Sequence, residues 1–177
     1  KMRFYFVLVV SCGVLGLAAC SPALNWREVR PELANLTLLL PCKPDRGSRE
    51  VPLGGQPITL RMVGCDASGA TFALAHAELG LTGEVDAALR GWRSATLSNL
   101  RGEQLREQAA RVAGTGAQGA GVDAVRVSAQ GTRADGSRVQ SEALYFSRGR
   151  HVYQAVIYAP RLTPEMSDMF FQSLRLQ

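Results

Sequence analysis

This sequence contains few of the residues that most enzymes use for catalysis or metal binding. Among its 177 residues there are only two histidines, whereas a catalytic zinc site needs three protein ligands. The motifs Cys-x-x-Cys, G-x-S-x-G and H-E-x-x-H and the P-loop signature do not occur. We therefore expect a protein that is not an enzyme and that holds no cofactor and no metal. A serine or carboxylate site without a motif stays open.

Lysine is almost absent, and the net charge of +5 is small for a chain of this length. Lys43 is the only lysine after residue 20. Nucleic-acid-binding domains carry a concentrated basic stripe interleaved with aromatic residues. The sequence has no such stripe, so we expect no nucleic-acid partner.

The sequence also lacks an apolar run long enough to cross a membrane as a helix, which takes about 20 residues. The longest run extends from Phe4 to Leu17, behind the positive residues Lys1 and Arg3. That length and those flanking charges are typical of a signal peptide, whose apolar region has roughly 7 to 15 residues.

The residues Leu17-Ala18-Ala19-Cys20, at the end of this run, resemble the bacterial lipobox. In lipoproteins the cysteine of this motif receives a diacylglycerol through a thioether, and the preceding segment is removed. The resemblance implies a signal peptide over residues 1–19 and lipidation of Cys20, which would anchor the protein to a membrane. Ser21 stands where Asp favours inner-membrane retention, so it implies an outer-membrane anchor with the domain facing the periplasm. The alternative is a soluble secretory signal with a chance small-small-Cys sequence.

The two remaining cysteines after Cys20 are Cys42 and Cys65. An even pair in an exported, oxidising compartment predicts a disulfide bond. The alternative is a redox-active or metal-binding thiol pair, but no histidine lies near either cysteine in the sequence.

We predict a lipidated cysteine and tether over residues 20–35 and a single α+β domain over residues 36–177. In the tether, Trp26 to Arg30 is expected to form at most one helical turn, with Trp26 packed onto the domain. Alternating and β-branched segments predict strands over 36–40, 48–53, 58–65, 70–78, 124–133, 138–146 and 151–158.

Two helical regions are predicted from spacing and capping residues. The first begins at Thr82 and buries a stripe around Trp92; it continues, or restarts, over Glu103 to Val112, where Glu107 and Arg111 would pair at i,i+4. The second begins at Thr163 as N-cap, with Pro164 at its first position. The small alanines on one face of the 70–78 strand predict that a helix covers that face.

Two short motifs could suggest binding sites. Residues 114–119 read G-x-G-x-x-G, but a dinucleotide site needs a strand before the motif and a helix after it. The predicted order here is reversed, so we expect a flexible connection. His76 and Glu78 would share one strand face, which a metal could use, but a structural histidine is the expectation.

Three features together resemble the PsbP-like superfamily: the segment Leu38-Leu39-Leu40-Pro41-Cys42-Lys43-Pro44, the strand, helix and meander order, and the ending Phe170-Phe171-Gln172-Ser173-Leu174-Arg175-Leu176. The resemblance implies an antiparallel β-sheet flanked by helices, and a role in binding or assembling other proteins. It transfers no catalytic or cofactor residue.

The leading hypothesis is a non-enzymatic lipid-anchored envelope protein that binds or stabilises another envelope protein. The alternative is a small-ligand-binding protein or enzyme that uses a pocket between sheet and helix, for which we expect a concave apolar pocket with a few polar groups near His76 or His151. A purely structural envelope component is a third possibility.

Overall fold

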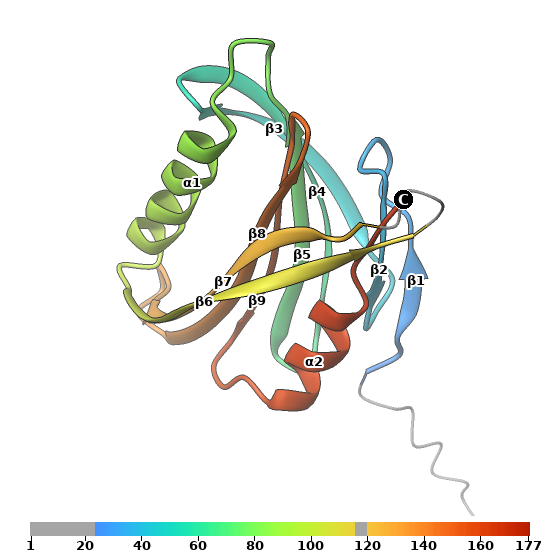
Figure 1. Ribbon diagram of the computed structural model, residues 1–177. Helices are drawn as coiled ribbons and strands as arrows, with labels where there is room; N and C mark the ends of the chain where they lie inside the picture. The colour runs from blue at the N-terminus through green and yellow to red at the C-terminus, as the bar shows by residue number, and fades with distance from the viewer. Residues whose placement is uncertain (1–23, 116–119) are drawn as a thin grey trace, which may run out of the picture.

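The computed structural model describes residues 24–115 and 120–177. These residues are mostly in sheet, with 55% of them in strands and 16% in helices, and the elements are shown in Figure 1. In chain order they are β1 (Arg27–Val29), β2 (Leu36–Leu40), β3 (Asp45–Leu53), β4 (Gln56–Ala67), β5 (Ala70–Glu78), α1 (Val85–Asn99), β6 (Glu103–Gly114), β7 (Val122–Thr132), β8 (Arg138–Arg148), β9 (His151–Ala159), α2 (Pro164–Gln172) and β10 (Arg175–Leu176).

The strands form one curled sheet in the order β1-β2-β10-β6-β7-β8-β9-β5-β4-β3. Neighbouring strands are antiparallel, apart from β10 and β6, which run parallel. Two meanders, β3-β4-β5 and β7-β8-β9, are joined where β5 pairs with β9. The antiparallel sheet predicted from the sequence is therefore confirmed.

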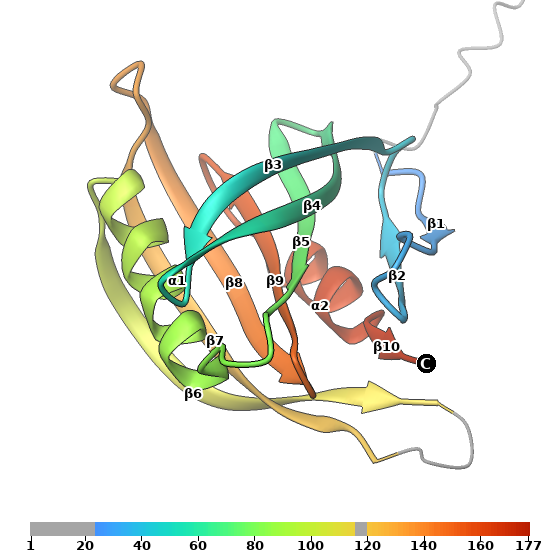
Figure 2. The ribbon, with the colours of Figure 1, turned by 90° about the horizontal axis from the view of Figure 1, so that it is seen from above.

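Both faces of the middle of the sheet, at β8, β9 and β5, are buried, each under a different helix. Figure 2 shows α1 and α2 on opposite sides of the strands β8, β9 and β5. Alternation along β5 directs Phe72 and Leu74 to the α2 side and Ala75 and Ala77 to the α1 side. The chain thus builds two cores on one sheet.

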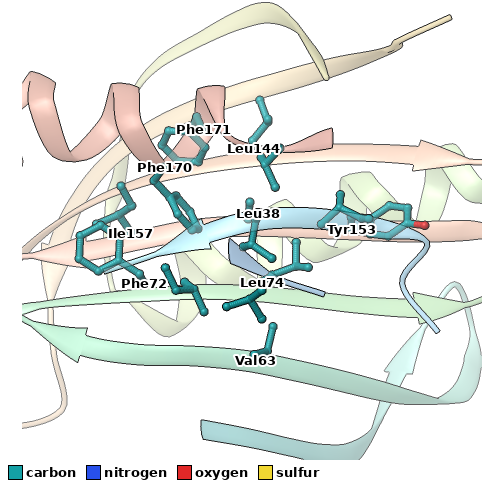
Figure 3. Packing of buried hydrophobic residues seen from close by; sticks show 14 of the residues in the cluster. Leu38, Val63, Phe72, Leu74, Leu144, Tyr153, Ile157, Phe170 and Phe171 are labelled. Atoms are coloured by element: carbon teal, nitrogen blue, oxygen red, sulfur yellow. The ribbon is translucent and has the colours of Figure 1, made fainter. Parts of the chain in front are cut away.

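The core under α2 is rich in large side chains. Phe170 of α2 points toward Phe72 of β5, with their ring centroids 5.6 Å apart, and Leu38 of β2 lies beside them (Figure 3). The curl of the sheet brings β2 over this same face, so that β2 completes the core together with α2.

Most predicted elements are confirmed. The strands over 36–40 and 70–78 have the predicted bounds, and Thr163 caps α2 by accepting a hydrogen bond from the backbone N–H of Met166. Helix α1 begins after Glu84, two residues later than predicted. The hydroxyl of Thr82 instead accepts a hydrogen bond from Gln56, at 2.9 Å.

The helix predicted over Glu103 to Val112 is wrong: this segment is strand β6, paired along its length with β7. Glu107 pairs with Arg93 of α1 at 2.8 Å rather than with Arg111. Gly102 lies between the end of α1 and the start of β6. A Cβ at this position would lie only 2.5 Å from the carbonyl oxygen of Gln130, so a larger residue would clash with β7. Pairing with β7 therefore overrides the local helical preference.

The helical turn predicted around Trp26 is also wrong, because Arg27–Val29 is strand β1, paired with β2. The described part of the expected tether, residues 24–35, packs onto the domain: Val29 and Ala34 are buried. Trp26 contacts Phe72, with ring centroids 5.7 Å apart, which confirms the predicted packing of this tryptophan. The packed domain thus begins before residue 36.

Several predictions fall outside the described residues. These are the signal peptide over 1–19, the lipidation site Cys20, and most of the motif over 114–119. Within residues 24–115 and 120–177, no helix is long and apolar enough to span a bilayer.

Candidate functional site

A cleft of about 520 Å³ lies between α1 and the strands β3, β4, β5 and β9. We call it the α1 cleft. Its walls are mainly apolar and include Val51, Leu60, Met62, Trp92, Leu100 and Val156. The volume is within the range of about 300–1,000 Å³ that is typical of small-molecule sites.

Small residues on both walls account for the cleft. Ala73 and Ala75 of β5 face Gly91 and Ala95 of α1 across it. The sequence correctly predicts a helix over the alanine face of β5, but the small side chains leave a hollow instead of filling the space.

Two contacts hold α1 at its distance from the sheet. Trp92 makes an edge contact with Tyr145 of β8, with ring centroids 6.4 Å apart. Near the start of the helix, buried Ala88 lies close to Gly54 in the β3–β4 turn, where a Cβ on the glycine would be 3.4 Å from that of the alanine. Gly54 and Trp92, one from each contact, also line the cleft.

A buried polar network lies at the wall of the α1 cleft. Gln154 of β9 is only 6% exposed, and its Nε2 donates hydrogen bonds to the hydroxyls of Thr96, at 3.0 Å, and Tyr145, at 2.8 Å. The Thr96 hydroxyl donates in turn to the carbonyl of Trp92. Burial raises the pKa of Tyr145, so its phenol stays neutral. The network therefore fixes α1 against β8 and β9.

Tyr158 of β9 adds an uncommitted polar group to the cleft. Burial raises the pKa of its phenol. In the described part of the chain no protein group hydrogen-bonds its hydroxyl. This hydroxyl can therefore donate to, or accept from, a bound molecule.

The two histidines of the chain come together on the opposite face of the sheet. His76 is opposite Tyr153 in the β5–β9 register, and Glu78 is opposite His151. The ring centroids of His76 and His151 lie 6.2 Å and 6.5 Å from that of Tyr153. In residues 24–115 and 120–177 no three His, Cys, Asp or Glu side chains are placed to hold a metal ion.

The histidine region is polar and offers little enclosed space. Cavities of about 280 Å³ and 180 Å³ adjoin His76, beneath a loop in which Leu33 and Asn35 have positive φ angles of 60° and 46°. The Nδ1 of His151 is buried without a hydrogen-bond partner among the described residues. The sequence predicts an apolar pocket near His76 or His151. The α1 cleft is larger and more apolar than the two cavities beside His76, and it lies on the other face of the sheet.

His76 is held neutral by its surroundings. Burial is the main cause, and electrostatic interactions with Arg61 and His151 add to it, so that the pKa falls to about 4. The carbonyl of Glu32 accepts a hydrogen bond from the ring, which opposes the shift in part. The remaining acid of this region, Glu78, is paired with Arg150 at 2.6 Å.

This pKa predicts a loss of stability in mild acid. The unfolded chain takes up a proton near pH 6.5 and the folded chain only near pH 4, so the stability present above pH 6.5 is lost as the pH falls toward 4. Between pH 7 and 4.5, we expect urea denaturation to show a loss about 2 kcal/mol larger for the wild type than for His76→Gln. Parallel pH profiles for the two proteins would contradict this.

The predicted disulfide is confirmed. Cys42, which follows β2, is bonded to Cys65 of β4, with their Cα atoms 6.0 Å apart. The bond joins the β1–β2 end of the chain to the β3-β4-β5 meander.

Sequence reasoning missed the residues that shape the α1 cleft. Thr96, Gln154 and Tyr158 lie in an ordinary amphipathic helix and an ordinary strand, and nothing in their spacing marks them. The only signal in the sequence was the series of alanines at alternate positions of β5, which places small side chains on one face of that strand.

No protein-family model and no curated protein gives a significant match to this chain. Among solved structures, the chain is similar to the solution structure of cyanobacterial PsbP (CyanoP) from Synechocystis sp. PCC 6803. The TM-score is 0.53 at 10% identity, over 96% of this chain and 99% of the other. A protein of unknown function from Pseudomonas aeruginosa, PA94, has a TM-score of 0.37 at 15% identity, over 79% and 84% of the two chains. The similarity to CyanoP concerns the fold, and the chain therefore has a PsbP-like fold.

Proposed function

We propose that this protein is a non-enzymatic, lipid-anchored envelope protein that binds a small, largely apolar molecule in the α1 cleft. The observation that carries this proposal is the cleft itself, because small residues on both of its walls keep it open. Binding is favoured over catalysis because the side-chain donors of Gln154 and Thr96 are already used within the protein.

The chemistry of the cleft sets the size and polarity of the ligand. If each non-hydrogen atom takes roughly 30 Å³, the liquid volume of one water molecule, the cleft holds about 17 such atoms. Apolar surface removed from water contributes about 25 cal/mol per Å². A molecule of this size with an apolar body would gain most of its affinity from the walls, while the Tyr158 hydroxyl could orient one polar group.

The test uses N-phenyl-1-naphthylamine, an uncharged apolar dye whose fluorescence rises in an apolar site. We expect saturable binding by the wild type and at least tenfold weaker binding by Ala95→Phe, because the new ring occupies the cleft. Ala87→Phe is the matched control, since Ala87 is exposed on the same helix and does not line the cleft.

Two results would contradict the proposal. One is a wild type that binds no dye. The other is an Ala95→Phe variant that remains folded, by circular dichroism, and binds as tightly as Ala87→Phe.

The lipid anchor is tested separately. Cells that express the full chain and are fed a labelled fatty acid should label the wild type and leave Cys20→Ala unlabelled, because the thioether needs the Cys20 sulfur. The unlabelled variant should also leave the membrane fraction. Equal labelling of the two proteins would end the anchor proposal.

Binding of another envelope protein, the first hypothesis from the sequence, is a second candidate that one feature favours. Strand β6 pairs with β10 only at Ala113 and Gly114, and in Figure 2 the rest of β6 forms an outer rim of the sheet. Its side chains are largely exposed. An extended segment of a partner could add there as a further strand.

A further inference from the structure

One charged residue, Arg49 of β3, lines the α1 cleft. In β3, Val51 and Leu53 belong to the core under α1, and strand alternation puts Arg49 on the same face. Among the described residues that line the cleft there is no Asp or Glu. The charge of the cleft is therefore positive.

The guanidinium of Arg49 is uncommitted. In the part of the chain that the structure describes, the exposed side chain of Arg49 makes no ion pair and no hydrogen bond. By contrast, Arg93 of α1 is paired with Glu107 at 2.8 Å and Arg126 of β7 with Glu142 at 2.7 Å. A cation beside an apolar surface and without a protein partner can bind an anion from outside.

The cleft extends from this cation to the hydroxyl of Tyr158, which is also uncommitted. Arg49 lies on β3 and Tyr158 on β9, with β4 and β5 between them in the sheet. Three strand spacings of about 4.8 Å put these strands roughly 14 Å apart. The apolar residues Met62, Ala75 and Val156 lie in the interval. The cleft is thus mainly apolar, with the polar residues Thr96 and Gln154 at its wall, and cationic at its β3 side.

We infer that the ligand of the α1 cleft is an amphiphile with one acidic group, whose apolar chain lies between α1 and β5 and whose acid is held by Arg49. This inference rests on the proposed function. The acid can be a carboxylate or a phosphate, because the planar guanidinium can donate a pair of hydrogen bonds to either group.

The experiment measures displacement of the uncharged dye by tetradecanoate, tetradecanol and tetradecyl phosphate, each below its critical micelle concentration. The three probes have the same number of carbon atoms and differ mainly in the head group. We expect the wild type to bind tetradecanoate or tetradecyl phosphate about tenfold more tightly than tetradecanol. A gain of this size corresponds to one charge-assisted hydrogen bond between Arg49 and the acid. The stronger of the two acids identifies the head group.

In Arg49→Gln, the preference for the acid should disappear while the affinity for tetradecanol stays unchanged. Arg46→Gln is the matched control. Arg46 lies on the same strand but lines the 280 Å³ cavity beside His76, on the opposite face of the sheet. The acid preference should also weaken at high salt, since an exposed ion pair is screened.

The outcomes separate the two proposals. If the wild type binds tetradecanol and both acids equally, the acidic ligand is wrong while the apolar cleft stands. If Arg49→Gln weakens acid and alcohol alike, Arg49 contributes only packing, which also overturns the inference. If neither the dye nor any of the three probes binds, the proposed function itself fails.

Discussion

Replacing Phe72 by alanine should lower the free energy of unfolding by about 4 kcal/mol, the usual cost of removing a fully buried phenylalanine. Phe72 is 0% exposed and contacts both Trp26 and Phe170 edge-on. It joins the start of the domain, strand β5 and helix α2. The cavity left by the ring would be bounded by three separate segments, which could not close it without moving α2.

Urea denaturation followed by far-ultraviolet circular dichroism measures this loss. Met169→Ala is the control on α2, because Met169 is 41% exposed and its removal should change stability by no more than about 0.5 kcal/mol. A Phe72→Ala protein within about 1 kcal/mol of the wild type would mean that the α2 core is not packed as described.

Removing the disulfide by the double substitution of Cys42 and Cys65 with alanine should cost about 3 kcal/mol, with a melting temperature roughly 6 to 12 °C lower. The bond spans 23 positions of sequence and restricts the unfolded chain over the whole β2–β4 region. Alanine is preferred to serine because Cys65 is buried, and a hydroxyl there would need a hydrogen-bond partner.

Reduced wild-type protein provides the matched comparison for the double variant. Both lack the bond, so their melting temperatures should agree and lie below that of the oxidised protein. Equal melting temperatures for oxidised and reduced wild type would show that the bond contributes nothing to stability. Two free thiols in periplasmic protein would show that it does not form there.

Strand β6 shows where sequence reasoning failed and why. Its residues have good helix propensity, and a Glu–Arg pair at i,i+4 strengthened the helical prediction. Yet the preference per residue is only a few tenths of a kcal/mol, whereas pairing with β7 satisfies a row of backbone groups along the segment. The glycines Gly102 and Gly131 let the two strands approach where β6 begins.

The candidate site was foreseen only in outline. A pocket between sheet and helix was among the expectations, and the alanines of β5 pointed to the face that α1 covers. The polar residues were not foreseen, because Gln154 and Thr96 are 58 positions apart and meet only when α1 crosses β9. The two histidines converge for a similar reason, through the register of β5 and β9.

Local information in the chain was sufficient for most strands, the cap of α2 and the pairing of Cys42 with Cys65. These features depend on neighbouring residues or, for the disulfide, on there being a single available partner. The β-structure of residues 27–29 and 103–114, the spacing of α1 above the sheet, and the polar lining of the cleft came from contacts between distant segments. Such contacts outweigh weak local preferences, and their geometry depends on strand register and side-chain volume across the whole sheet.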